Sequence, residues 1–277
     1  MSENYFKCEP GRFCQDATCC RTVETQPCVS VGDFLRLSEY TDEPPEHIWK
    51  SRGDVSLSKH SDMKSGQFLV TLSLLHDPCP YLTDDSKCGI YAARPLGCAS
   101  FPLVLYAEQN ESRRQYEHYA CLKGAEARPE QIGLWQQLRD ILQTEAETEI
   151  AHFWRGKTIY IDASKTSDYF RFAGQAMDLQ LKRDPKLKSY DPETRPDCCS
   201  KRSVKLMKAI KQAIQMSNSG ELQNDVKTYD YIELLRPVMF AVLEDDIAER
   251  LATLDGKARE MYKETSERWK NLSRKIE

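Results

Sequence analysis

The stretch Cys79-Pro-Tyr-Leu-Thr-Asp-Asp-Ser-Lys-Cys88-Gly-Ile-Tyr-Ala-Ala-Arg94-Pro95-Leu-Gly-Cys98-Ala-Ser-Phe-Pro102 holds three closely spaced cysteines, and further cysteines lie on both sides of it. Thiolates are the ligands that zinc and iron-sulfur clusters prefer, and several must converge on one point to hold such a group. We therefore predict that eight cysteines bind metal: Cys8, Cys14, Cys19, Cys20, Cys79, Cys88, Cys98 and Cys121.

The composition favours metal ligation over disulfide bonds. A chain of 277 residues is long enough to build a core without cross-links, and its 11 cysteines, an odd number, cannot all pair with one another. The N-terminal sequence, from Met1 to Lys7, lacks the apolar segment of a secretory signal. We therefore expect a cytoplasmic location, where reducing conditions keep thiols available to metals.

Charge and hydropathy argue against two classes of partner. The net charge is -4, with 39 Lys and Arg against 43 Asp and Glu, so no basic field attracts nucleic acid or anionic lipid. The longest apolar run, residues 68–75, is far shorter than the roughly 20 residues of a membrane-spanning helix. We expect no nucleic-acid partner and no membrane association. A protein substrate or partner and the oligomeric state are left open.

The cysteine distribution and the helical periodicity predict an α-rich α+β fold. Residues 1–128 would form a loop-rich metal module with short strands at 66–75 and 101–106. Within it, residues 29–37 predict a short strand followed by a helix that begins at Asp33. Residues 129–277 would form a helical region packed on the module, with helices over 134–153, 168–181 and 204–214 and a long terminal helix that opens at Pro237.

The cysteine spacings exclude the common metal motifs. Five residues separate Cys8 from Cys14 and eight separate Cys79 from Cys88, which is too wide for zinc knuckles and does not match a ferredoxin. The adjacent residues Cys19 and Cys20 direct their side chains differently, so we expect them to serve two metal centres or one multinuclear core. Because the ligands are far apart in sequence, metal binding should be coupled to folding of the module.

These residues carry a family resemblance. The early cysteines, the segment Val29-Ser-Val-Gly-Asp-Phe-Leu-Arg-Leu37 and the stretch from Cys79 to Pro102 together resemble the YkgJ-type cysteine-cluster family, which is named for a CxxCxxCC signature. Cys121 resembles the late cysteine of such proteins. The resemblance implies a zinc- or iron-chelating domain over about residues 5–125 and says little about the rest of the chain.

Arg94 and Pro95 lie between two predicted ligands. Proline fixes the backbone of the turn, and the guanidinium group can donate to thiolate or cluster sulfur and offset negative charge. We therefore predict that Arg94 supports the metal centre from outside the ligand set. A surface arginine in a salt bridge is the alternative.

The family resemblance extends to the flagellin lysine N-methylases, which use S-adenosylmethionine and combine a similar module with helices. The 12 glycines are too widely spaced for a GxGxxG or Walker A loop, so no ordinary nucleotide or methyl-donor motif supports an enzyme. Whether the chain is an enzyme stays open, and no catalytic residue is assigned. The two hypotheses are a metal-binding protein with a structural or redox-sensing cluster and a protein lysine N-methyltransferase with bound S-adenosylmethionine.

Several weaker candidates accompany the cluster. His76 and His118 each lie three residues before a predicted ligand, so either is a candidate auxiliary ligand, although surface or hydrogen-bonding roles are commoner. The roles of Cys28, Cys198 and Cys199 stay open. The adjacent residues Cys198 and Cys199 could fold back onto the cluster or form a redox pair, and two ordinary thiols fit them equally well.

Overall fold

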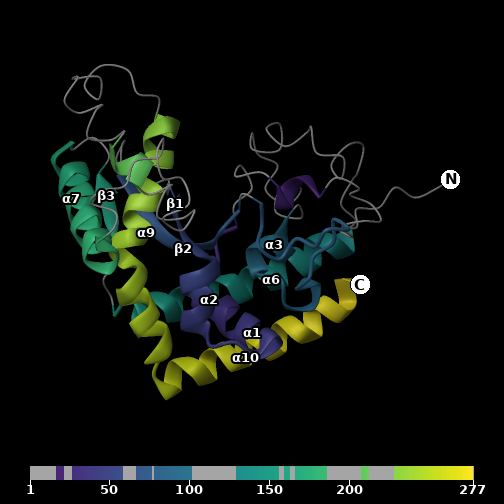
Figure 1. The fold of residues 1–277 in the computed structure, drawn as a ribbon. Helices are drawn as coiled ribbons and strands as arrows, with labels where there is room; N and C mark the ends of the chain where they lie inside the picture. The colour runs from purple at the N-terminus through teal and green to yellow at the C-terminus, as the bar shows by residue number, and fades with distance from the viewer. Residues whose placement is uncertain are drawn as a thin grey trace. The chain divides into compact units, whose positions relative to one another are not determined.

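Helices dominate the fold, and they are accompanied by a three-stranded sheet of order β1-β2-β3 (Figure 1). The computed structural model describes residues 17–21, 27–58, 67–76, 78–101, 129–155, 159–162, 166–185, 207–211 and 228–276. The predicted α-rich α+β class is confirmed. No helix in these ranges has both the length and the apolar character needed to cross a membrane.

The chain divides into two compact units, each assembled from segments that are distant in sequence. Unit 1 comprises Met1–Gly53, Leu72–Lys157 and Ala248–Glu277, and unit 2 comprises Asp54–Thr71 and Thr158–Ile247. The sequence predicts a metal module up to residue 128 and a helical region after it. This division concerns function as well as packing, and it stays a prediction.

The helices of unit 1 supply the framework for the predicted ligands. Among the described residues they include α1 (Val31–Thr41), α2 (Pro45–Arg52), α3 (Leu96–Ser100), α6 (Pro129–Thr148) and α10 (Gly256–Ile276), with short 3-10 turns η1 (Thr18–Cys20) and η3 (Tyr91–Ala93). A single turn of π-helix, η4 (Glu149–Phe153), continues α6.

Helix α1 begins two residues before the predicted start. Ser30 is its N-cap: the hydroxyl accepts a hydrogen bond from the backbone N–H of Asp33, and the Asp33 carboxylate accepts one from the N–H of Ser30, each at 3.0 Å. This reciprocal pair is a capping box. Asp33 therefore lies within the first turn of the helix and is not its first residue. The strand expected before the helix is reduced to an isolated bridge between Cys28 and Ser73.

An apolar core joins α3, α6 and α10. Leu96 and Ala99 of α3 pack with Leu138 of α6 and Trp269 of α10 in one buried cluster. Full burial of a leucine such as Leu138 stabilises the fold by about 2 kcal/mol. The short α3 therefore keeps its place through contacts with two long helices.

The predicted helix over 134–153 is confirmed in α6 and η4, but one of its apolar positions is not buried. Ile150, which the periodicity places inward, is 46% exposed. The inward positions at this end of α6 are occupied by Glu145 and Thr148, which are 0% and 2% exposed. A hydrophobic pattern could not reveal this polar interior.

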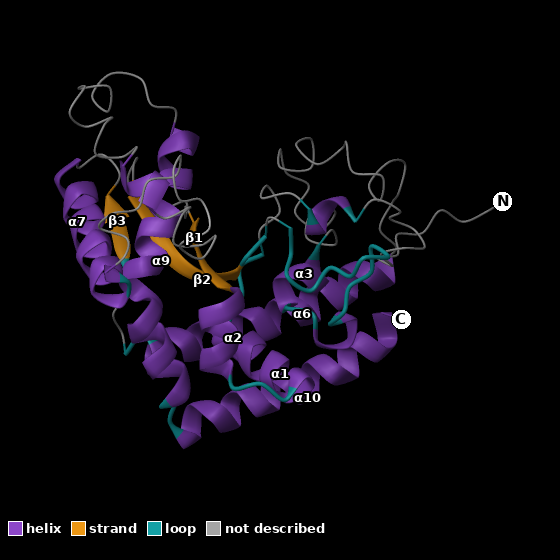
Figure 2. Cartoon of the chain, viewed as in Figure 1, coloured by secondary structure: helices purple, strands orange, loops and turns teal. Residues whose placement is uncertain are grey.

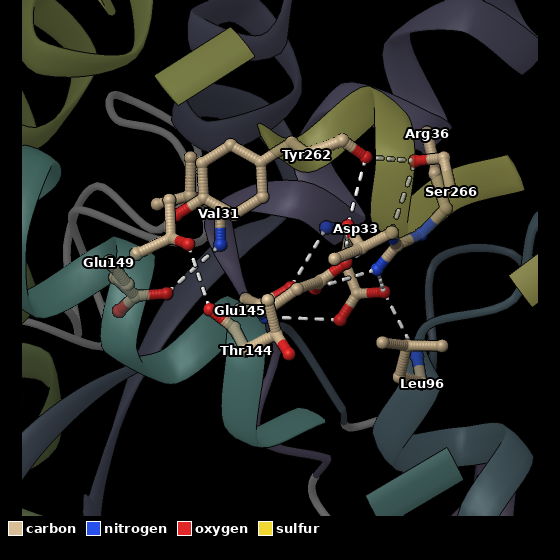
Figure 3. A network of polar contacts seen from close by, with 12 residues as sticks. Val31, Asp33, Arg36, Leu96, Thr144, Glu145, Glu149, Tyr262 and Ser266 are labelled. Carbon is tan, nitrogen blue, oxygen red and sulfur yellow. Dashed lines mark hydrogen bonds and ion pairs between the residues drawn. The ribbon is translucent and has the colours of Figure 1, made fainter. Parts of the chain in front are cut away.

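That interior is a buried charge network centred on Arg36 (Figure 3). The Arg36 guanidinium donates to Asp33 Oδ1 at 2.5 Å and to both Glu145 carboxylate oxygens, at 2.5 and 3.0 Å. Burial opposes the positive charge, but Asp33 and Glu145 more than offset it and raise the pKa of Arg36. Burial also disfavours the charged form of Asp33 and so raises its pKa. The attraction of Arg36 counteracts part of that rise. The guanidinium thus stabilises two carboxyl groups whose burial would otherwise be unfavourable.

The network connects four elements of unit 1. Thr265 of α10 donates to Glu145 Oε1 at 2.7 Å, and Arg36 also donates to Ser266 Oγ at 3.3 Å. Asp33 Oδ1 accepts a hydrogen bond from the backbone N–H of Leu96 at 2.9 Å. Because Leu96 is the first residue of α3, the carboxylate of α1 satisfies an N–H group at the start of that helix.

Most of the sheet and of two long helices, which Figure 2 shows in orange and purple, belongs to unit 2. The sheet consists of β1 (Gly53–Ser58), β2 (Gln67–Leu74) and β3 (Tyr160–Asp162), and Phe68 of β2 pairs with Ile161 of the antiparallel β3. Helices α7 (Thr166–Arg183) and α9 (Thr228–Ala252) pack through a buried cluster that includes Ala176 and Ala241. The predicted strand at 66–75 and helix at 168–181 are confirmed, and residues 207–211 of the predicted helix over 204–214 are helical. The strand predicted at 101–106 lies mostly outside the described residues.

The prediction that Pro237 opens the terminal helix is wrong. Pro237 lies inside α9, and a separate helix, α10, follows. An interior proline removes one backbone hydrogen bond and costs about 3 kcal/mol. The residues directly after it, Val238, Met239, Phe240 and Ala241, are all buried, and this packing offsets the loss.

The buried charge network leaves no space for a side chain at Gly32. A Cβ atom added there would lie 2.7 Å from the Glu145 carboxylate. We expect Gly32→Ala to lower the free energy of unfolding by about 1–3 kcal/mol, because the carboxylate must leave Arg36 or the helices must separate. Urea unfolding followed by circular dichroism measures the change.

Gly133 provides the matched control within α6. A Cβ atom at this position meets no atom within 4 Å, so Gly133→Ala should raise the free energy of unfolding by about 0.5–1 kcal/mol through helix propensity alone. Equal effects of the two substitutions would contradict the assigned role of Gly32.

Glu149 should make stability depend on pH. Burial raises its pKa from 4.5 to about 7, although hydrogen bonds from Trp154 Nε1 and the Val31 N–H favour the ionised form. A carboxyl group with a raised pKa in the folded state stabilises the fold fully below pH 4.5, and this contribution is lost as the pH rises through 7. Relative to Glu149→Gln, the wild type should lose at most about 3 kcal/mol between pH 4.5 and 8. Parallel pH profiles in urea unfolding would refute this role.

Candidate metal centre

One pocket of unit 1 gathers five of the eight predicted cysteine ligands. Its lining includes Cys19, Cys20, Cys79, Cys88 and Cys98, together with His76, Arg94, Tyr91 and apolar residues. The cysteines come from η1, from a loop after β2 and from α3. Every predicted cysteine ligand that the structure describes therefore lies at this pocket.

The adjacent pair Cys19 and Cys20 lies in η1, after Ala17 in the left-handed conformation (φ 45°). Their Sγ atoms are 4.0 Å apart, and both residues line the pocket. Two thiolates that bind one tetrahedral ion at about 2.3 Å are separated by roughly 3.8 Å. The pair can therefore serve one ion as well as two, which weakens the expectation that vicinal cysteines require separate centres.

A tight hairpin brings Cys79 and Cys88 to the same pocket. Leu82 and Cys88 form an isolated antiparallel bridge, and the N–H of Gly89 donates to the carbonyl of Tyr81 at 2.8 Å. The hairpin explains how two cysteines with eight intervening residues, too many for a zinc knuckle, still line one pocket. The N–H of Cys79 also donates to the carbonyl of Cys20 at 2.8 Å, which links the hairpin to η1.

Cys98 reaches the pocket from the short helix α3. Pro95 is the N-cap, and its carbonyl accepts a hydrogen bond from the N–H of Ala99 at 2.9 Å. A Cβ atom on Gly97 would lie 2.6 Å from the carbonyl oxygen of Cys28. Glycine is therefore needed before Cys98, because two backbone segments approach closely at this point.

The thiols influence one another electrostatically. Burial raises the pKa of Cys79 to about 11, with a further rise from Cys20 and Cys88. Burial also raises the pKa of Cys88, and it raises that of Cys98 well above the ordinary value. The hydrogen bond with Cys19 lowers the pKa of Cys20 despite burial. Since thiolates bind metal, metal binding must release several protons and should weaken as the pH falls.

Arg94 lies beside the thiols. It lines the pocket, its guanidinium stacks 4.5 Å from the ring centre of Tyr91, and its charge favours the ionised form of Cys88. Within the described ranges no carboxylate pairs with Arg94, so the salt-bridge alternative has no support there.

The described residues alone do not form a complete set of ligands for a metal ion. In this part of the chain, no three Cys, His, Asp or Glu side chains converge closely enough to hold one ion. Three predicted ligands, Cys8, Cys14 and Cys121, lie outside the described residues, as do His118, Cys198 and Cys199. Cys28 is exposed and is not among the lining residues. The five gathered thiols nevertheless match the soft donor set that zinc or an iron-sulfur cluster requires.

The buried network that supports α3 was not predicted from the sequence. The segment Val29 to Leu37 carries part of the family resemblance, but its pattern predicts only a helix start at Asp33 and no role for Ser30 or Arg36. One signal was present: Ser30 and Asp33 have the spacing of a capping box, and Arg36 follows one turn later in an apolar stretch. Glu145 carried no comparable signal.

Comparison with known proteins identifies the segment that contains this pocket. Residues 7–122 match the family model described as "CxxCxxCC: Putative zinc- or iron-chelating domain". No curated protein and no solved structure matches the chain. The matched range contains all eight predicted cysteine ligands, along with Asp33, Arg36 and Arg94. The similarity to this putative zinc- or iron-chelating domain therefore extends over the part of the chain that contains the cysteine pocket.

Proposed function

We propose that this chain is a metal-binding protein whose cysteine pocket holds a polynuclear centre of iron or zinc. One observation carries the proposal: five cysteines line a single pocket, and three more predicted ligands belong to the same family domain. A tetrahedral ion takes four ligands. The supply of thiols therefore exceeds what one ion uses and suits two zinc ions or an iron-sulfur cluster.

Charge balance supports the same assignment. A centre bound by several thiolates carries excess negative charge, which nearby cations and hydrogen-bond donors must offset. Arg94 lines the pocket and already favours the thiolate form of Cys88. The guanidinium is thus available to stabilise a bound anionic centre.

We further propose that the centre responds to redox state. Cys19, Cys20, Cys79 and Cys88 are partly exposed, whereas a purely structural zinc site usually encloses its sulfur ligands. Partly exposed thiolates are accessible to small oxidants. This exposure favours a redox-sensing role over a purely structural one.

A protein lysine N-methyltransferase is the second candidate. The wall of the pocket beside the thiols is apolar and aromatic, with Leu74, Ile90, Tyr91 and Phe101. Such a wall suits an organic ligand next to the metal centre. Its described lining comes from residues 19–101, which gives no support for a methyl-donor site formed with the C-terminal helices.

The metal is tested on full-length protein purified without oxygen. We expect elemental analysis to find more than one equivalent of iron or zinc per chain. Absorption in the near-ultraviolet and visible regions then distinguishes a coloured iron-sulfur centre from a colourless zinc site. Metal-free protein with unchanged stability would refute the proposal, because ligation by this many residues should be coupled to folding.

Cys98→Ser tests the pocket directly, with Cys28→Ser as the matched control. Cys98 lines the pocket, whereas Cys28 is exposed and outside the lining. We expect Cys98→Ser to reduce the metal content at least twofold and Cys28→Ser to leave it unchanged. Circular dichroism verifies that both variants are folded. Equal metal content in both would contradict the assignment of Cys98 as a ligand.

S-adenosylmethionine separates the two candidates. Isothermal titration of the metal-loaded protein should show no binding if the centre acts only as a redox sensor. Saturable binding that disappears on removal of the metal would instead support the methyltransferase.

A further inference from the structure

We infer that His76 supplies a nitrogen ligand to the metal centre through Nδ1, so that the centre is a mixed thiolate and imidazole site. The inference rests on the proposed function and deepens it. The family signature contains cysteines alone, so this residue is an addition to the ligand set.

His76 occupies a suitable position. It follows β2 by two residues and precedes Cys79 by three, and only 5% of its surface is exposed. It lines the same pocket as the five cysteines. A buried imidazole in a pocket lined by cysteines is in the kind of environment where zinc and iron sites bind histidine.

A hydrogen bond fixes the form of the imidazole ring. Nε2 of His76 forms a hydrogen bond with the backbone carbonyl of Cys19. A carbonyl oxygen can only accept, so Nε2 must carry the proton and donate. In the neutral ring, the lone pair is then on Nδ1, which is also buried. Metal-binding histidines have this arrangement, with one nitrogen on the metal and the other donating to a carbonyl.

The acceptor of this hydrogen bond belongs to a predicted ligand residue. His76 thereby links the end of β2 to η1, which carries Cys19 and Cys20. A neutral imidazole in place of a thiolate lowers the negative charge of the centre. In an iron-sulfur centre, this replacement raises the reduction potential.

X-ray absorption at the edge of the bound metal tests the inference on full-length protein purified without oxygen. The wild type should show a nitrogen shell with the multiple scattering of an imidazole ring. His76→Gln should lose this signature, because the glutamine retains an N–H donor for the Cys19 carbonyl but has no ring nitrogen. His47→Gln is the control, since His47 is exposed; it should retain the signature.

A second variant keeps the test decisive if His76→Gln does not fold. The chain has five histidines, and replacing the other four with glutamine leaves His76 as the single imidazole. This variant should retain the imidazole signature. Metal bound through sulfur alone in the wild type, or an imidazole signature that persists in His76→Gln, would overturn the inference and leave the proposed function intact. Absence of bound metal would overturn the proposed function and this inference with it.

Discussion

The Arg36 guanidinium, held between the carboxylates of Asp33 and Glu145, is the interaction on which unit 1 depends. The side chains of Arg36, Asp33 and Glu145 are 4%, 1% and 0% exposed, so each charge relies on the others for stabilisation. Removal of one member of such a buried group costs about 3–5 kcal/mol, because the remaining charge loses its partner. The network joins α1, α6 and α10, and Asp33 extends it to the first N–H of α3. The helix that carries Cys98 is thus connected directly to this buried charge network.

Two glycines allow these parts to approach one another. Gly32 leaves room for the Glu145 carboxylate beside α1, and Gly97 leaves room for the Cys28 carbonyl beside α3. Both lie in the sequence segments that carry the family resemblance, Val29 to Leu37 and Cys79 to Pro102. In physical terms, the first segment builds the polar core and the second presents the thiols. The cysteine pocket therefore depends on residues that bind no metal.

Much of this arrangement could be predicted from the sequence, for identifiable reasons. Cysteine has a specific ligand chemistry, so Cys79, Cys88 and Cys98 could be predicted to lie at one site before any geometry was known, and all three line one pocket. The amphipathic pattern of α6 likewise predicts its buried face at Trp135, Leu138 and Ile141. The remaining features depend on tertiary contacts that no local pattern encodes. The buried Glu145 resembles a surface residue in sequence, and Pro237 resembles a helix start until the packing that follows it is known.

Local backbone geometry explains how cysteines with unusual spacings lie at one pocket. Cys79 and Cys88 are brought together by a hairpin, and the Sγ atoms of Cys19 and Cys20 are 4.0 Å apart despite their adjacency in sequence. Anomalous diffraction at the metal edge, on crystals of the full-length protein grown without oxygen, tests the central claim most directly. The account predicts two or more metal atoms bordered by Cys19, Cys20, Cys79, Cys88 and Cys98. A single metal peak away from this pocket, or none, would contradict it.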